Sequence, residues 1–288
     1  LYYPSLITMS NESSLKASIR KINDNAVTIS TPHTVFRILN FGARMSLINF
    51  DGNVIIYSPM KYDQEVFDKA IKVLFENQEN PQYEVKYVIA ANDEHNLWAH
   101  VYKEKFGSKI IDGENCKLKS NCKADHVVTS KIYNKVIKGS MWQDELNVSD
   151  PFMQSLELIG LGNHVIHDLE LFDTTSKTLY VGDSIYNLGV PGTTSGNVIL
   201  EQYSPELGYA KGYNPHGWFS FLTRYLQPDS IICRYLANYA AGTKTKEGKE
   251  AIQTVYNWDF DKLVMIHGNV IEKDGKDAWK KLFASSLV

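Results

Sequence analysis

Residues 86–107 constrain the fold of this chain more than any other stretch. They begin with a strand of β-branched and aromatic residues and continue into the polar sequence Asn92-Asp93-Glu94-His95, after which a helical pattern extends to Phe106. Strand ends hold such a loop in place, and the first turn of the helix offers unpaired N–H groups to a ligand. The stretch therefore predicts an α/β protein with a functional site in this loop.

The composition excludes several classes of partner. The chain has 288 residues, of which 43% are hydrophobic and 22% charged, as in ordinary globular proteins. Its formal net charge is −3, and its basic residues are spread along the sequence, which argues against binding of nucleic acid. No apolar run approaches the roughly 18–20 residues of a membrane span. We expect a small-molecule substrate or ligand, no nucleic-acid partner and no membrane partner; the oligomeric state stays open.

The cysteines and the N-terminus bear on location and domain limits. Three cysteines, an odd number, favour a reducing compartment, and the first residues lack the pattern of a secretory signal, so we expect a cytoplasmic protein. Met9 begins a sequence that resembles a natural start, and whether residues 1–8 are native is open. We expect residues 1–24 to form a loosely ordered extension and residues 25–288 a single domain.

Alternating strand and helix patterns fill most of the chain. Strands are expected at 26–30, 35–39, 45–50, 53–58, 85–90, 108–111, 169–173, 178–181 and 261–266. Helices are expected to begin at 63 and near 95, to span about 217–226, 228–241 and 246–257, and to begin again near 274. Asp51-Gly52 predicts a tight hairpin, and residues 174–177 a second one. Residues 112–153 are expected to form a long connection with one short helix.

Residues 187–221 are rich in glycine, proline and aromatic residues. Within them, the aromatic segment 202–219 has three interpretations: it covers a cleft as a substrate wall, packs on the core, or forms a partner surface.

Three predicted strand ends carry polar side chains that can bind metal: Asn92-Asp93-Glu94-His95, Gly182-Asp183 and His267-Gly268. With the hairpins before them, their order resembles the metallo-β-lactamase superfamily. In that superfamily a His-x-His-x-Asp-His motif follows a strand, and a later His, an Asp after Gly and a His before Gly complete two metal sites. The resemblance covers residues 34–286 and implies an α/β fold, a four-layer αββα sandwich.

A second set of residues is similar to one branch of this superfamily, known as a domain of unknown function. These residues are Gly42-Ala43-Arg44-Met45-Ser46, Tyr57-Ser58-Pro59 and Ala91-Asn92 followed by His95. The branch brings no assigned reaction, so this similarity informs the fold more than the function.

The metal motif departs from the superfamily pattern. The two leading motif histidines correspond to Ala90 and Asn92, and the motif aspartate corresponds to Glu94. The resemblance therefore implies one reduced site in place of two. The implied metal ligands are His95, Asp183, His267 and Glu94, with His164 and His167 as weaker candidates for the later histidine. Such a set suits one divalent metal, zinc or iron, although manganese is also compatible.

The implied activity is hydrolysis of a small molecule by a metal-activated water, with Glu94 and Asp183 as catalytic residues. Two alternatives remain open: a non-catalytic, metal-free binding scaffold, and a non-haem iron oxidoreductase. The lost histidines favour the scaffold, whereas the ligands that survive at three strand ends favour the enzyme. Each residue taken alone also fits a structural role, since Asp183 could cap a turn, His267 could lie in the core and Glu94 could be a solvated carboxylate.

Overall fold

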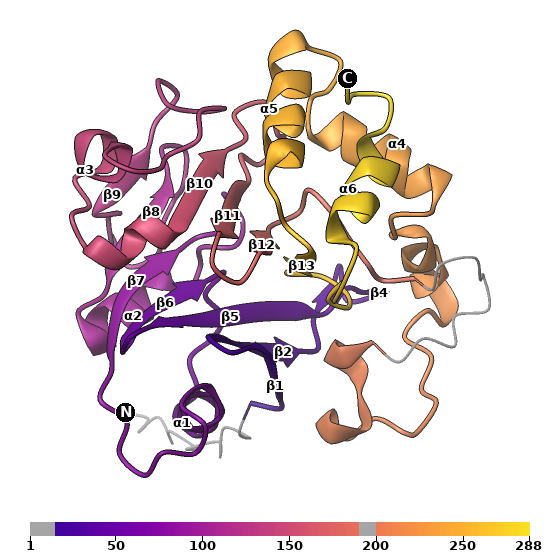
Figure 1. Cartoon of the computed structure of the whole chain (residues 1–288). Helices are drawn as coiled ribbons and strands as arrows, with labels where there is room; N and C mark the ends of the chain where they lie inside the picture. The colour runs from indigo at the N-terminus through magenta and orange to yellow at the C-terminus, as the bar shows by residue number, and fades with distance from the viewer. Residues whose placement is uncertain (1–14, 190–199) are drawn as a thin grey trace, which may run out of the picture.

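The structure, a computed structural model, describes residues 15–189 and 200–288. Two β-sheets pack face to face, and helices cover the outer face of each sheet, as Figure 1 shows. Helices α1 (Gln64–Leu74) and α2 (Ala99–Phe106) cover one outer face, and α4 (Ile231–Ala240), α5 (Lys246–Asn257) and α6 (Gly275–Phe283) cover the other. The predicted four-layer αββα sandwich is confirmed.

The larger sheet has seven strands within the described ranges, in the order β1-β2-β5-β6-β7-β8-β9. The strands are β1 (Ser18–Asn23), β2 (Ala26–Thr31), β5 (Ala43–Phe50), β6 (Asn53–Tyr57), β7 (Glu84–Ile89), β8 (Lys109–Gly113) and β9 (His126–Val128). Pairing is antiparallel from β1 to β6 and parallel from β6 to β9. The parallel pairs β6–β7 and β7–β8 need crossover connections, which α1 and α2 supply, and residues 114–125 connect β8 to β9 without a helix.

The smaller sheet consists, among the described residues, of β10 (Leu156–Gly160), β11 (Leu169–Asp173), β12 (Thr178–Val181) and β13 (Lys262–Met265), in that order. Only its last pair, β12 with β13, is parallel. A separate hairpin pairs β3 (Thr34–Val35) with β4 (Leu39–Asn40). The remaining elements are α3 (Met141–Leu146) and the 3₁₀ helices η1 (Pro151–Ser155), η2 (Glu201–Tyr203), η3 (Pro205–Leu207) and η4 (Trp218–Tyr225).

Local sequence explains two elements of the larger sheet and its cover, the β5–β6 hairpin and helix α1. The β5–β6 hairpin turns at Asp51 and Gly52, which both have positive φ (50° and 86°), as a tight turn of this kind requires. Helix α1 starts where the Asp63 carboxylate accepts a hydrogen bond from the Val66 N–H. Its buried residues recur at helical spacing and face the sheet: Val66, Phe67, Ala70, Ile71 and Leu74.

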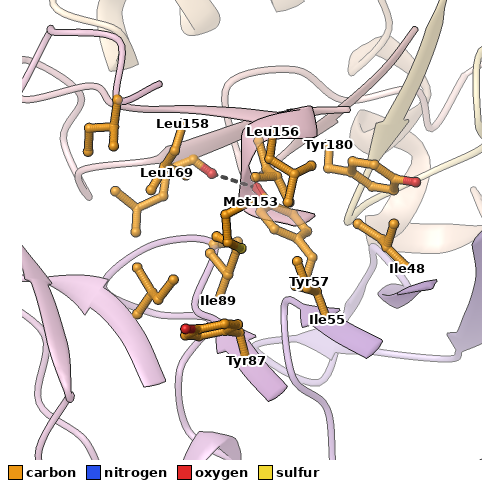
Figure 2. Packing of buried hydrophobic residues seen from close by; sticks show 14 of the residues in the cluster. Ile48, Ile55, Tyr57, Tyr87, Ile89, Met153, Leu156, Leu158, Leu169 and Tyr180 are labelled. Carbon is orange, nitrogen blue, oxygen red and sulfur yellow. Dashed lines mark hydrogen bonds between the residues drawn. The ribbon is translucent and has the colours of Figure 1, made fainter. Parts of the chain in front are cut away.

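The core between the sheets fixes how they sit on each other. Apolar side chains from β6 and β7, such as Ile55 and Ile89, meet Leu158 and Leu169 from β10 and β11 (Figure 2). A buried hydrogen bond crosses this apolar layer: the Tyr57 hydroxyl donates to the Leu169 carbonyl oxygen at 2.8 Å. The bond ties the end of β6 to the start of β11.

The structure differs from the sequence predictions in several elements. Residues 18–23, within the predicted extension 1–24, form β1 at the edge of the larger sheet. Its charged and polar residues suit an edge strand but hide the strand pattern. The strand expected at 35–39 is instead the β3–β4 hairpin, because Phe36 and Arg37 have positive φ. The connection expected at 112–153 contains β9, which was not predicted, nor was β10 after it.

Some expectations fall outside the described residues: the status of residues 1–8, the rest of the extension up to residue 14, and residues 190–199 of the stretch rich in glycine, proline and aromatic residues. No helix within the described ranges is long and apolar enough to cross a membrane.

Replacing Tyr57 with Phe tests the inter-sheet hydrogen bond. We expect Tyr57→Phe to lower the free energy of unfolding by about 1–2 kcal/mol, because the buried Leu169 carbonyl loses its donor. Urea denaturation measures the change. Tyr62→Phe is the control, since the Tyr62 hydroxyl donates to the exposed Gln64 side chain and its loss should change stability by less than about 0.5 kcal/mol. Equal effects of the two substitutions would contradict the assignment.

Candidate metal centre

The parallel pair β12–β13 places two of the predicted ligands side by side. Val181 pairs with Met265 at the carboxyl ends of the two strands. Asp183 and His267 each follow two residues later, so both side chains arrive at the same edge of the sheet. Asp183 Oδ1 lies 3.3 Å from His267 Nε2. Strand register alone therefore accounts for this contact.

His95 reaches the same point from the larger sheet, in the loop between β7 and α2. A backbone hydrogen bond from Leu169 N to Ala91 O, 2.8 Å long, joins the end of β7 to the smaller sheet. Four residues further on, His95 Nε2 lies 3.4 Å from Asp183 Oδ2, and the His95 and His267 ring centroids are 5.1 Å apart. The loop is thus held against the ends of β12 and β13.

The three side chains have the chemistry of a candidate metal site. One ligand atom from each of His95, Asp183 and His267 lies within 4.8 Å of the other two, and this is the one group of its kind among the described residues. His267 Nδ1 donates to the Gly42 carbonyl oxygen at 2.6 Å, which leaves Nε2 to face Asp183. Two imidazoles and one carboxylate are a set that divalent zinc or iron accepts. The residues present fit one such ion.

Exposure and charge are uneven within this group. Asp183 and His267 are buried, whereas the His95 side chain is 23% exposed and marks the open side. Burial alone would lower the pKa of His95, but the Asp183 carboxylate raises it above its ordinary value. Burial would likewise raise the pKa of Asp183, yet His95 and His267 hold it well below the usual range. Asp183 is therefore charged at neutral pH.

Asn92 is central to this arrangement, although the sequence indicated only a lost ligand. Its Nδ2 donates to Asp183 Oδ2 at 2.9 Å and to Asp168 Oδ1 at 2.8 Å. Its Oδ1 accepts from the backbone N–H groups of Glu94 and His95, both at 3.0 Å. One fully buried amide therefore orders the loop that carries His95 and also separates two carboxylates.

A second layer of buried acids lies behind Asn92. The Ser184 hydroxyl is 2.6 Å from Asp168 Oδ2 and 2.5 Å from Glu170 Oε1, and both acids are fully buried. A hydroxyl has a single hydrogen, so one of these carboxyl groups must be protonated to make both bonds. Burial, and then the charge of Asp168, raises the pKa of Glu170 well above its ordinary value. Glu170 is thus the neutral member.

Sequence reasoning missed two further neighbours of the group. The Tyr186 hydroxyl donates to Asp183 Oδ1 at 2.8 Å, and the Tyr186 ring stacks on His267 with centroids 5.7 Å apart. His33 lies near enough that desolvation, followed by the imidazoles of His267 and His95, lowers its pKa. His33 comes shortly after the strand predicted at 26–30, so the strand-end criterion could have found it; no comparable signal marks Tyr186.

The other predicted ligands lie outside the group of three. Glu94 is exposed, and its charge contributes to the raised pKa of His95. His164 is buried with Nδ1 3.7 Å from Asp168 Oδ1. His167 Nδ1 lies 2.7 Å from Asp93 Oδ2, and its ring stacks on Tyr133. The structure brings together His95, Asp183 and His267, and it does not bring these three candidates to them.

The aromatic segment 202–219 divides into two parts. Tyr203 is buried, and its hydroxyl donates to the His33 carbonyl oxygen at 2.6 Å, so this part packs beside the hairpin that precedes Gly42. Trp218 and Phe219, at the other end, are 92% and 65% exposed. The first part agrees with core packing, and the second leaves large apolar side chains uncovered.

Replacing Asn92 with Asp tests the role of the amide. We expect Asn92→Asp, in metal-free protein, to lower the free energy of unfolding by about 3 kcal/mol or more at neutral pH, because it places a third carboxylate against Asp168 and Asp183. Chemical denaturation in chelator measures the change. Asn257→Asp, on the exposed surface of α5, is the control and should change stability little. A small loss at position 92 would show that the amide is dispensable.

The buried acid Glu170 makes stability depend on pH. Its folded pKa is raised, so above the ordinary value of 4.5 the unfolded chain releases a proton that the folded chain keeps, and stability falls as pH rises. Glu170→Gln keeps a donor for Ser184 and removes this dependence. We expect the free energy of unfolding of the variant to rise, relative to that of the wild type, by up to roughly 1.4 kcal/mol for each pH unit above 4.5.

Urea denaturation of both proteins at several pH values measures this difference. Glu65→Gln, on the exposed face of α1, is the control. It should change the free energy of unfolding by a small amount, and the difference from the wild type should not grow with pH. A Glu170→Gln difference that stays constant with pH would mean that Glu170 is charged in the folded protein.

The comparisons with known proteins agree with this architecture. No model of a known protein family matches the sequence, and no curated protein is significantly similar to it. Solved structures do match. DIM-1 metallo-β-lactamase exposed to ceftazidime is 13% identical with a TM-score of 0.54, and the match covers 96% of this chain and 100% of that one. A metallo-β-lactamase from Hirschia baltica is 10% identical with a TM-score of 0.51, covering 94% and 98%.

A third match is not a metallo-β-lactamase by name. The metal-soaked Flv1 flavodiiron core from Synechocystis sp. PCC6803 is 13% identical with a TM-score of 0.51, and the match covers 95% of this chain and 61% of that one. At such identities the likeness concerns the fold. The resemblance that the strand-end motifs indicated is therefore confirmed at that level: the chain has the metallo-β-lactamase fold.

Proposed function

We propose that this protein is a metal-dependent hydrolase of a small-molecule substrate, with a single divalent metal held by His95, Asp183 and His267. One observation carries the proposal: three loops at three separate strand ends bring their ligand atoms within 4.8 Å of one another. Buried histidines and acids with structural roles alone have no need to converge in this way. The formal net charge of −3 supports a small molecule over a nucleic acid as substrate.

The structural neighbours support the choice of metal and reaction class. Two of them are metallo-β-lactamases by name, and the third is the core of a flavodiiron protein soaked with metal. We therefore propose zinc or iron as the ion. We also propose a cytoplasmic location, which the three free cysteines support, since thiols persist in reducing compartments.

The chain's own residues have distinct proposed roles. When bound, the metal polarises a substrate oxygen and lowers the pKa of a water molecule to about 7. Asp183 stays charged between two imidazoles and sets their separation. Glu94, exposed beside His95, is proposed to accept a proton from the attacking water and to return it to the leaving group. His95 is the exposed member of the group, so substrate approaches from its side.

A metal-free binding scaffold is the second candidate, and Asn92 is the observation that favours it. Its amide bonds Asp183 directly, and Tyr186 and the two histidines surround the rest of that carboxylate. The charge of Asp183 is thereby compensated without an ion. An iron oxidoreductase shares the same ligands, so the identity of the bound metal separates it from the hydrolase.

Metal analysis tests the proposal directly. We expect protein purified without chelator to contain close to one equivalent of zinc or iron by elemental analysis. His95→Ala and Asp183→Asn should each lower the content at least roughly tenfold, because each removes one of only three protein ligands. Calorimetric titration of zinc into stripped protein measures the same loss as affinity.

Two control variants sharpen the result. His167→Ala removes a partly exposed histidine that lies outside the group, and it should leave the metal content unchanged. Glu94→Gln should also keep the metal while lowering ester hydrolysis by about 10²-fold or more, as loss of a general base does. Wild-type protein that neither holds nor takes up metal would reject the hydrolase and leave the scaffold.

A further inference from the structure

Helix α4 and the 3₁₀ helix η4 expose an unusual number of large apolar side chains. We call these nine residues the apolar face: Trp218, Phe219, Phe221, Leu222, Ile231, Ile232, Tyr235, Leu236 and Tyr239. They are between 46% and 92% exposed. Single exposed apolar residues are common on soluble proteins, but a contiguous set of this kind marks an interaction site.

The pattern within α4 shows that the exposure is systematic. The helix buries only Cys233 and Ala237, which are small and pack on the cluster beneath α5 and α6. Its outward side carries Ile231, Tyr235 and Tyr239 at a spacing of four residues. A surface helix normally turns polar residues outward, and a helix that is apolar all round is buried. Apart from the exposed Arg234, the solvent side of α4 therefore has the composition of a buried surface.

The area of the apolar face is sufficient for a stable interface. Fully buried aromatic side chains contribute about 150–250 Å² each, so nine residues at these exposures offer roughly 1,000 Å². A standard protein interface buries about 800 Å² on each partner. No additional surface is required to reach that size.

We propose that the apolar face binds the same face of a second copy of this chain, which makes the protein a homodimer. A two-fold axis places identical patches against each other, so a patch must complement itself. The ridge of residues 231, 235 and 239 meets this condition, because ridges at a spacing of four pack into the grooves of an identical helix that crosses at about −50°. The ring surfaces of Trp218 and Phe219 then extend the contact along η4.

The charge of this surface favours a protein partner over a lipid surface. Helices that lie on membranes are rich in Lys and Arg on their polar side. The described sequence of η4 and α4 contains only two basic residues, Arg224 and Arg234, and no acidic ones. Two basic residues over both elements are too few for the basic polar side of a membrane-surface helix, so this composition fits a protein partner better than anionic lipid.

The dimer would also support the candidate metal centre indirectly. The Ser220 hydroxyl in η4 accepts a hydrogen bond from Asn40 N at 2.9 Å, in the hairpin strand that leads to Gly42. Gly42 in turn accepts from His267. Covering η4 thus steadies the strand that orients one ligand, but the dimer itself requires no metal.

Measurement of mass in solution tests the proposal. We expect light scattering after gel filtration to give twice the 32.7 kDa of one chain, over loading concentrations of about 1–100 µM. The double variant Ile231→Glu with Tyr235→Glu should give the mass of one chain and raise the dissociation constant by roughly 100-fold or more. Its circular dichroism spectrum should match that of the wild type.

Two further variants secure the interpretation. Leu97→Glu introduces the same charge at an exposed apolar residue outside the apolar face, and it should keep the two-chain mass. Tyr235→Ser with Tyr239→Ser replaces two rings without adding charge, and it should give single chains even if the acidic variant fails to fold. Wild-type protein that runs as single chains throughout, or a dimer that survives both double variants, would overturn the proposal. Single chains that float with phosphatidylserine vesicles would assign the face to lipid and also overturn it.

Discussion

The buried carboxylate of Asp183 is the interaction on which the arrangement of the candidate centre depends. A charge taken out of water must be compensated at every oxygen, and here the partners come from both sheets. The β7 loop supplies Asn92 and His95, whereas Tyr186 and His267 follow strands of the smaller sheet. The two sheets therefore meet electrostatically at this carboxylate as well as through their apolar layer.

Strand direction explains why the centre forms at this edge. The β6–β9 half of the larger sheet is parallel, as is β12–β13 in the smaller one, and loops after parallel strands gather at one edge. The Tyr57–Leu169 hydrogen bond fixes the sheets relative to each other close to these loops. A modest shift between the sheets would separate His95 from Asp183. The packing of the core therefore also determines the geometry of the site.

Much of this could be predicted from sequence, for identifiable reasons. Strand ends marked by Gly182 and Gly268 located Asp183 and His267, because a polar residue directly after a buried strand has few places to go. Edge strands such as β1 were not predicted, since their charged residues hide the alternation of apolar and polar residues that identifies strands. The role of Asn92 was not predicted either, because an asparagine in place of a motif histidine indicates only a missing metal ligand. Its hydrogen bonds to Asp168 and Asp183 join residues 76 and 91 positions away, which no local pattern encodes.

The Asn92 amide limits which side chains its position can accept. It stands where the superfamily resemblance places a motif histidine, and its two atoms now serve four hydrogen bonds. Replacing Asn92 with histidine would break those bonds at once, while Ala90, the neighbouring motif position, would still lack an imidazole. A histidine at position 92 would therefore loosen the loop that carries His95 without completing the motif.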